Sequence, residues 1–431
     1  MGSAKNHAPN LNCRHVWIDN GTGSFDNPPM LQLEEARRRV LAAIEPLPAE
    51  AVPLSGAVGR VLAETILAPL DLPLFDNSAM DGYAVRAADL ARARAEAPVA
   101  LRLAGQVAAG ETLAGGVSAG TCVRLFTGSP LPAEADAVVM QEDTRPSPDA
   151  PGQVLFLETV KPWENLRLRG EDVKRGSPLV QAGERLTAGA AGLLAAVGIR
   201  EIRAGRRPVI GLLATGSELT EAGQPLAPGR IYESNRISLA PWLAEAGAVP
   251  RVFPLVRDTL AETRAALEQA LAECDGVVTT GGVSVGELDF VKQAFVDLGG
   301  VMDFWKVAIK PGKPFVFGRC GGKILFGLPG NPVSALVTFL LLARPALLRW
   351  QGAARVELPA MSGVLAEPLA NRGDRRHFLR VIVDEQGGVR SAGAQASHFL
   401  SSLARANGLV EVPPATTLAE GTRVQVLRLE V

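Results

Sequence analysis

The sequence predicts a multidomain chain in which an α/β domain is flanked by β-rich regions. Its 431 residues exceed the size at which a single hydrophobic core keeps growing. Between residues 208 and 350, buried strand-like runs alternate with helical stretches, which is typical of a parallel sheet covered by helices. Short strand patterns rich in glycine and proline occupy residues 99–180 and the region after residue 360. Both of these regions are therefore expected to form β modules.

The composition is that of an ordinary globular protein, with 47% hydrophobic and 21% charged residues. The net charge of -1, the five tryptophans and the two tyrosines argue against a nucleic-acid-binding surface. The longest apolar stretch, Val333 to Leu348, is interrupted by Arg344 and Pro345, so no membrane span is predicted.

Cysteine and histidine are scarce in this chain. The four cysteines are scattered without paired spacing, which favours a reducing cytoplasm. With only four histidines, a zinc or iron site is not expected, and any metal should be a hard, oxygen-bound cation such as Mg²⁺. Residues 1–30 are polar and lack the apolar core of a signal peptide, so we expect a flexible leader there.

Two helical patterns follow the leader. The first, from Leu31 to Ile44, has apolar residues at helical spacing. The second is a short helix expected between Leu54 and Leu70. The chain then enters a region of short strands, where acidic and hydroxyl residues recur at loop tips. An Asx-turn cluster explains Asn77 and Ser78 well and Asp81 less well, so Asp81 is a candidate functional residue.

Three strand patterns in the α/β region end in polar loops. They lead into Thr215–Glu218, into Arg257–Asp258 and into Thr279–Asp289. Because the carboxyl ends of parallel strands meet at one edge of a sheet, ligands gather there. The sequence therefore predicts a common site built from these three loops.

The loop from Thr279 to Asp289 is the most informative of the three. Gly281 and Gly282 follow a buried strand and precede a helix, a design that presents backbone N–H groups to a phosphate or another oxyanion. Glu287 and Asp289 add negative charge to this anion site, and a cation shared between the carboxylates and the ligand resolves that conflict. The alternative is an ordinary strand-to-helix turn whose glycines only permit close packing.

Two further segments could complete an anion site. Lys306, Lys310 and Lys313 surround a Pro-Gly turn, and they are either a solvated loop or ligands for an oxyanion. Residues 324–334 repeat the strand, glycine turn and helix design. The helix expected from Pro332 to Trp350 therefore offers a second N-terminus to an anion.

Taken together, these motifs resemble the molybdopterin molybdenumtransferases, the family of MoeA and the gephyrin E domain. The resemblance covers residues 31–431 and rests on an ordered set of motifs: FDNSAMDGYAVR, RLFTGSPLP, VVMQE, RGEDV, TGSEL, IYESNR, TTGGVSVGELDFVK, FWKVAIKPGKPF and GLPGNPVSALVTF. A single glycine loop would be weak support, whereas nine motifs in one order are specific.

The resemblance implies an elongated homodimer built from several domains, including a three-layer α/β domain like those of MoaB and MogA. The expected division is a flexible leader (1–30), a helical linker and dimerisation subdomain (31–67 with 178–206), a β-rich module (68–177), the α/β molybdopterin-binding domain (207–357) and a small C-terminal β domain (358–431).

The resemblance also implies a reaction. Members of the family take adenylated molybdopterin and molybdate, insert the metal and release AMP with the help of Mg²⁺. By motif position, the functional residues fall on Asp81, Thr127, Glu218, Asp258, Asp289, Lys306 and Lys310. In the implied dimer, the β module of one subunit brings Asp81 and Thr127 to the α/β domain of the other.

Within that site, Asp258 and Asp289 are expected to hold Mg²⁺, with Glu218 in support. The two lysines Lys306 and Lys310 would neutralise molybdate and phosphate charge. The residues expected to bind the substrate are Thr280, Gly281, Gly282, Ser284, Gly286, Lys313, Pro329, Gly330, Asn331 and Ser334.

The chain departs from the family pattern in two places. Ala396 stands where relatives have a glycine before Ser-His, so Arg375 and Ser397 are only auxiliary candidates for molybdate contact. Ser217 stands where relatives have an acid. The alternative functions are a molybdopterin adenylyltransferase, which would share the α/β domain, and a gephyrin-like scaffold. A transient contact with the adenylyltransferase is also expected.

Overall fold

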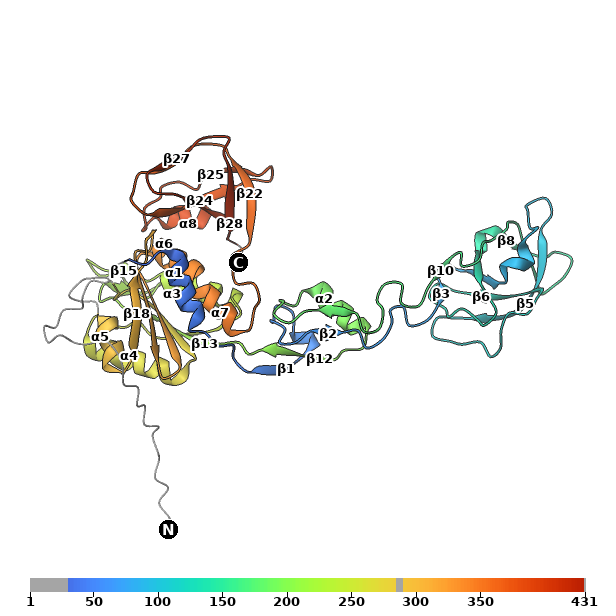
Figure 1. Cartoon of the computed structure of the whole chain (residues 1–431), viewed down its shortest axis with the longest axis horizontal. Coiled ribbons are helices and arrows are strands. Elements are labelled where there is room, and N and C mark those ends of the chain that lie inside the picture. The colour runs from blue at the N-terminus through green and yellow to red at the C-terminus, as the bar shows by residue number, and fades with distance from the viewer. Residues whose placement is uncertain (1–29, 284–289, 430–431) are drawn as a thin grey trace, which may run out of the picture.

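The computed structural model describes residues 30–283 and 290–429. Figure 1 shows an elongated molecule, with the α/β domain and the C-terminal β domain together at one end and the β-rich module at the other. A narrow middle segment joins the two ends. The predicted class, α/β plus β in an elongated multidomain chain, is confirmed.

The α/β domain is built on one six-stranded sheet. Its strands lie in the order β16 (Val249–Val252), β13 (Val209–Ala214), β17 (Gly276–Thr280), β21 (Lys323–Leu328), β20 (Pro314–Cys320) and β18 (Val301–Lys306). The first four strands are parallel, as predicted; β20 runs antiparallel to them, and β18 pairs antiparallel with β20. The carboxyl ends of β13, β17 and β21 therefore open at the same edge.

Helices cover both faces of this sheet, which gives three layers. Alternate strand residues point to opposite sides: Leu212 and Phe326 pack in one core cluster, and Leu213 and Leu325 pack in another. The helices of the first face are α1 (Leu33–Ala42), α3 (Asn235–Glu245), α6 (Pro332–Thr338) and α7 (Arg344–Trp350), and those of the second are α4 (Leu260–Glu273) and α5 (Phe290–Asp297).

The helical run Pro332–Trp350 is long and apolar enough to cross a membrane, but 94% of its apolar 18-residue stretch is buried inside the protein. It is the core helix of the α/β domain. A π-helical turn, η4 (Phe339–Ala343), separates α6 from α7. Pro345 explains the irregularity, because proline has no N–H to donate to the preceding turn.

The middle segment corrects the predicted helical linker. The helix expected between Leu54 and Leu70 is wrong: a 3₁₀ turn, η1 (Leu54–Gly56), is followed by a turn at Gly59, whose φ of 82° is left-handed. The segment is mainly two strand pairs and one helix, and α1 packs into the α/β core instead. Its elements are β1 (Ala49–Pro53), β2 (Ile66–Leu67), β11 (Pro178–Val180), α2 (Ala188–Ala196) and β12 (Glu201–Gly205).

The β-rich module contains a second six-stranded sheet with its own core of valine, leucine and Phe156. Its strands lie in the order β7 (Ala137–Met140), β4 (Gly82–Val85), β6 (Thr121–Leu125), β5 (Val99–Val107), β9 (Gln153–Phe156) and β8 (Thr144–Pro146). Outside that sheet lie the pair β3 (Asn77–Ser78) and β10 (Leu166–Arg167), and the 3₁₀ turns η2 (Ala87–Leu90) and η3 (Gln141–Asp143).

The C-terminal domain is joined to the α/β domain by a shared sheet. Strand β19 (Ile309–Lys310) leaves the α/β domain and pairs in parallel with β24 (Arg376–Val383), so Lys310 lies opposite His377. The remaining elements are β22 (Ala360–Leu365), β23 (Leu369–Asn371), β25 (Gly388–Ser391), α8 (Leu400–Arg405), β26 (Gly408–Val412), β27 (Thr416–Leu418) and β28 (Arg423–Arg428).

Candidate active site

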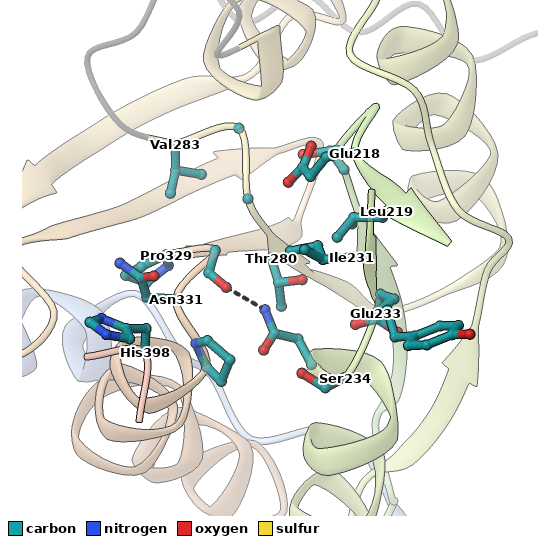
Figure 2. Close-up of a pocket in the computed structure, with 18 of the residues that line it drawn as sticks. Glu218, Leu219, Ile231, Glu233, Ser234, Thr280, Val283, Pro329, Asn331 and His398 are labelled. Carbon is teal, nitrogen blue, oxygen red and sulfur yellow. Dashed lines mark hydrogen bonds between the residues drawn. The ribbon is translucent and has the colours of Figure 1, made fainter. Parts of the chain in front are cut away.

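A pocket of about 670 Å³ lies where the parallel strands of the α/β domain end. The loops after β13, β16 and β17 all contribute to it, so the three predicted strand ends do meet. Figure 2 shows Thr280 near its centre, between Glu218 and Ser234, with Asn331 and His398 on the opposite side. Of the predicted site residues, the lining contains Glu218, Asp258, Thr280, Gly281, Gly282, Pro329, Gly330 and Asn331.

The glycine turn after β17 needs its glycines for two reasons. Gly281 and Gly282 both have left-handed backbones, with φ of 86° and 64°. A Cβ on Gly281 would also overlap the carbonyl oxygen of Thr215, and one on Gly282 would lie 2.8 Å from the Thr215 hydroxyl. The N–H of Gly281 already donates to the carbonyl of Leu328 at 3.1 Å. Gly281 therefore contributes space to the turn and no free donor.

The substitution Gly281→Ala is expected to destabilise the α/β domain by about 1–3 kcal/mol, because it adds a steric overlap to a positive φ. Gly223→Ala is the matched control, since Gly223 has a φ of 87° in the same domain but no atom within 4 Å of the place a Cβ would take. Thermal unfolding of both variants separates the two causes. Equal destabilisation of the two variants would show that the added Cβ at residue 281 does not clash with Thr215.

Three acidic residues line the pocket, and two of them, Glu218 and Asp258, are predicted site residues. Asp258 is half-buried and accepts a hydrogen bond from the N–H of Ser217 at 2.8 Å, while its own N–H donates to the Ser217 hydroxyl at 3.0 Å. Glu218, which follows Ser217 in the sequence, is exposed and lies beside Gly216. This reciprocal pair ties the loop after β13 to the loop after β16, and both carboxylates thereby reach one cavity.

The donor set suits Mg²⁺, which takes one or two carboxylates together with substrate phosphates and water. Within residues 30–283 and 290–429, no group of three or more histidine, cysteine or acidic side chains gathers into a metal site. Of the three described carboxylates in the pocket lining, Glu233 accepts a hydrogen bond from Arg236 at 3.0 Å. Glu218 and Asp258 are therefore the ones that suit a cation. The predicted residues Ser284, Gly286 and Asp289, and the unassigned Glu287, lie outside the described residues.

The loop from β15 (Ile231–Tyr232) to α3 forms a wall that sequence reasoning missed. Buried Arg236 donates to Glu233 at 3.0 Å, to Glu221 at 2.6 Å and to the carbonyl of Phe253 at 2.6 Å. Burial opposes its charge, but the bonds to both glutamates outweigh burial and raise the pKa of Arg236. The one signal of this wall in the sequence was the IYESNR motif, which contributed to the family resemblance but was given no predicted role.

The N-terminus of the long helix also opens on the pocket. Gly330, Asn331 and Pro332 all line the cavity, and the Asn331 side chain makes no capping hydrogen bond. The N-terminus of this 19-residue helical run carries positive potential, although Pro332 has no N–H and the N–H of Val333 donates to the carbonyl of Ser397. Ser334 lies buried in the first turn of that helix and is not part of the pocket lining.

The predicted lysines do not line the pocket, and one of them, Lys310, lies beside the C-terminal domain. Lys306 ends β18, and Lys310 and Lys313 are exposed on either side of Pro311–Gly312. Arg375 donates to the carbonyl of Ile309 at 2.9 Å, which brings it to β19. Ser397 accepts at its carbonyl from the N–H of Val333 at 3.1 Å. Cationic groups of two domains therefore gather at one seam.

His377 lies buried in this seam, and its Nε2 has no hydrogen-bond partner among the described residues. Burial lowers the pKa of His377 to about 4, and the charges of Lys310, Arg380 and Arg375 add to the effect. Burial is thus the main reason that His377 is neutral, and the three neighbouring cations add to it.

Asp81 and Thr127 form a pair on the β-rich module. Both the N–H and the hydroxyl of Thr127 donate to one oxygen of Asp81, each at 2.8 Å. The backbone bond, then the hydroxyl bond, lower the pKa of Asp81, with a smaller contribution from Arg124. Burial slightly opposes this shift. The pair lies in the β-rich module, at the opposite end of the molecule from the α/β domain that holds the pocket (Figure 1). A single subunit therefore does not bring Asp81 and Thr127 to the pocket.

Three family profiles match the chain in order. They describe the MoeA N-terminal region, domains I and II (residues 31–198), a probable molybdopterin binding domain (211–349) and the MoeA C-terminal region, domain IV (362–429). Together they span the middle segment, the β-rich module, the α/β domain and the C-terminal domain.

Curated relatives and solved structures agree with these profiles. The chain is 40% identical to the molybdopterin molybdenumtransferase of Haemophilus influenzae, over 88% of this chain and 93% of the relative. It is also 40% identical to molybdopterin molybdenumtransferase 2 of Mycobacterium tuberculosis, over 92% and 99%. Two crystal structures of molybdopterin biosynthesis MoeA proteins from Pyrococcus are 34% and 30% identical, each with a TM-score of 0.79, and cover 94% and 93% of this chain and 100% of their own.

Proposed function

The chain belongs to the MoeA family of molybdopterin molybdenumtransferases, and from this premise we propose that it inserts molybdenum from molybdate into adenylated molybdopterin with release of AMP. The observation that supports the proposal is the convergence of β13, β16 and β17 on one pocket. That pocket combines carboxylates, a glycine turn and a helix N-terminus, which are the groups that a substrate with a pyrophosphate bond requires.

We assign the charged end of the pocket to the pyrophosphate. Asp258 would hold Mg²⁺ together with Asp289, and Glu218 would support them from the neighbouring loop. When bound, the ion would offset the repulsion between these carboxylates and the substrate phosphates. The protein's own contribution is positional, because the two hydrogen bonds between Ser217 and Asp258 fix the loop that carries the carboxylate.

The pterin phosphate is assigned to the two glycine turns. Gly281 and Gly282 remove side chains from its path, and the N-terminus of α6 at Asn331 adds positive potential. Thr280 adds a hydroxyl at the centre of the pocket. The predicted contacts from Ser284 and Gly286 lie outside the described residues, and Lys313 and Ser334, which do not line this pocket, have no part in this assignment.

Molybdate is assigned to the seam between the α/β and C-terminal domains. Lys306, Lys310 and Arg375 would neutralise its two negative charges, and Ser397 would add a donor. The position of Lys310 opposite His377, with Arg375 bonded to Ile309 in the same strand, supports the assignment, because an oxyanion there would meet cations of both domains.

Lys310→Ala is expected to raise the molybdate concentration for half-maximal rate about 10-fold, since it removes one exposed cation from the seam. The rate at saturating molybdate should change less. Lys161→Ala, which removes an exposed lysine from the β-rich module, is the matched control. An unchanged molybdate dependence would remove Lys310 from the oxyanion site.

We further propose a homodimer with an active site shared between subunits. Helix α2 has the sequence AGAAGLLAA, and of its nine residues only Leu194 is buried. A helix that is apolar all round is normally covered, so a second subunit would cover it. The segment of the β-rich module around Asp81 exposes Leu74, Phe75 and Met80, and the pocket rim exposes Ile231 and Tyr232. Docking these surfaces would complete the site.

A single assay tests the proposed function. The protein is incubated with preformed adenylated molybdopterin, and AMP should appear only when molybdate is added. Incubation with molybdopterin, ATP and Mg²⁺ serves as the control for an adenylyltransferase, and formation of the adenylated pterin there would contradict the proposal. A scaffold would give neither reaction. The adenylyltransferase remains the proposed transient partner, because it would supply the substrate.

A further inference from the structure

Two buried oxygens in the pocket wall have no hydrogen-bond partner among the described residues. They are Oδ1 of Asn235, on a residue 8% exposed, and the hydroxyl of Thr215, on a residue 6% exposed. Both residues line the cavity. Buried polar groups are nearly always paired in folded proteins, and the proposed roles of the carboxylates, glycines and lysines use neither of these oxygens.

The orientation of the Asn235 amide is defined by its other end. Its Nδ2 donates to the carbonyl of Gly330 at 2.8 Å, the bond drawn dashed in Figure 2. Because the amide nitrogen is engaged there, the oxygen is the part of the side chain left for another group, and it can only accept. A phosphate or molybdate oxygen also accepts, so neither satisfies it. An N–H group does.

Asn235 is also held rigidly. It is the first residue of α3, directly before Arg236, which is tied to Glu233, Glu221 and the end of β16. Gly330, its partner, packs against Gly281, since a Cβ on Gly330 would lie 3.6 Å from the Gly281 Cα. Gly281 in turn leaves no room beside Thr215. The two unpaired oxygens therefore belong to one framework that also carries both glycine turns.

We infer that Asn235 and Thr215 recognise the ring of the substrate, with Asn235 Oδ1 accepting a hydrogen bond from a heteroaromatic N–H or amino group, an inference that rests on the proposed function. Adenylated molybdopterin offers this chemistry twice, on the aminopyrimidinone edge of the pterin and on the amino group of adenine. A site built to pair with an N–H rejects analogues that lack it, because its acceptor is then left buried and unpaired. These residues thus determine specificity, while the charged groups determine affinity for the phosphates.

The test measures the dissociation constants of molybdopterin and of AMP separately, for wild type, Asn235→Ala and Ser238→Ala. Ser238 donates to the carbonyl of Asn235 at 3.1 Å from the next turn of α3 and does not line the pocket, so it controls for the helix end. Asn235→Ala should weaken one probe about 10- to 100-fold. Loss for molybdopterin assigns the bond to the pterin, and loss for AMP assigns it to adenine. Unchanged affinity for both probes would overturn the inference.

Thr215→Val keeps the test decisive if Asn235→Ala does not fold. It exchanges the hydroxyl for a methyl group of similar shape and breaks no hydrogen bond of that hydroxyl among the described residues. We expect about a 10-fold weaker binding of the same probe, and wild-type affinity would contradict the inference. Wild-type AMP release is measured in parallel. If the wild-type protein releases no AMP while binding of a probe still depends on Asn235, the proposed function is wrong, but the inference that Asn235 recognises the ring stands.

Discussion

Replacing Asp258 with asparagine is expected to lower molybdate-dependent AMP release about 100-fold or more, the scale seen when one preorganised electrostatic group is removed from an active site. The substitution preserves shape but removes the negative charge proposed to hold Mg²⁺. It also weakens the acceptor that takes the Ser217 N–H at 2.8 Å. Titration with Mg²⁺ during the assay should show a raised requirement for the ion.

Ser217→Ala separates the two contributions of Asp258. It removes the hydroxyl that accepts from the Asp258 N–H at 3.0 Å but leaves the carboxylate in place. We expect a loss of about 10-fold or less, the cost of one hydrogen bond. If Ser217→Ala is as damaging as Asp258→Asn, then Asp258 acts by fixing the loop and not by its charge.

The second large effect is expected at the opposite end of the molecule. Asp81→Ala should also reduce AMP release about 100-fold, although Asp81 is exposed and lies far from the pocket in its own subunit. Because the side chain is exposed, the thermal unfolding of the variant should match that of wild type. Normal activity would remove the β-rich module from the active site.

Thr127→Val tests the ionisation of Asp81. The native pKa is lowered, so Asp81 stays ionised down to a pH below its ordinary range and loses its charge only as the pH falls through that lowered value. Removing the Thr127 hydroxyl leaves only the backbone donor and should raise the pKa. The acid limb of the pH–rate profile should therefore move to higher pH. Thr121→Val, which loses a hydroxyl bond at the other end of β6, should not move it.

The parts of the site that could be predicted from sequence are those set by local rules. A buried strand that ends in Thr-Gly or Thr-Thr-Gly-Gly indicates where the strand stops, and parallel strands place such ends at one edge. For this reason the sequence alone was enough to place Glu218, Asp258 and Gly281 in a common pocket. The resemblance carried by the ordered motifs adds Asp81 and Thr127 to the site as a proposal.

The remaining features depend on contacts between distant segments. In the sequence, Asn235 is an ordinary residue at the start of a helix. Its role depends on the hydrogen bond that its amide donates to the carbonyl of Gly330, 95 positions later. The pairing of β19 with β24 likewise joins Lys310 to His377 across two domains. The expected helix between Leu54 and Leu70 failed because the left-handed backbone at Gly59 and the strand pairing of β2 with β11 prevail over helical spacing.

The central claim is that two subunits share each active site, and subunit mixing tests it most directly. Asp81→Ala and Asp258→Ala are each expected to be inactive alone. If subunits exchange at random, half of the dimers are hybrids, and each hybrid has one site free of both changes, so activity should return to about a quarter of wild type. A mixture that stays inactive, although hybrid dimers are present by native mass measurement, would contradict the shared site.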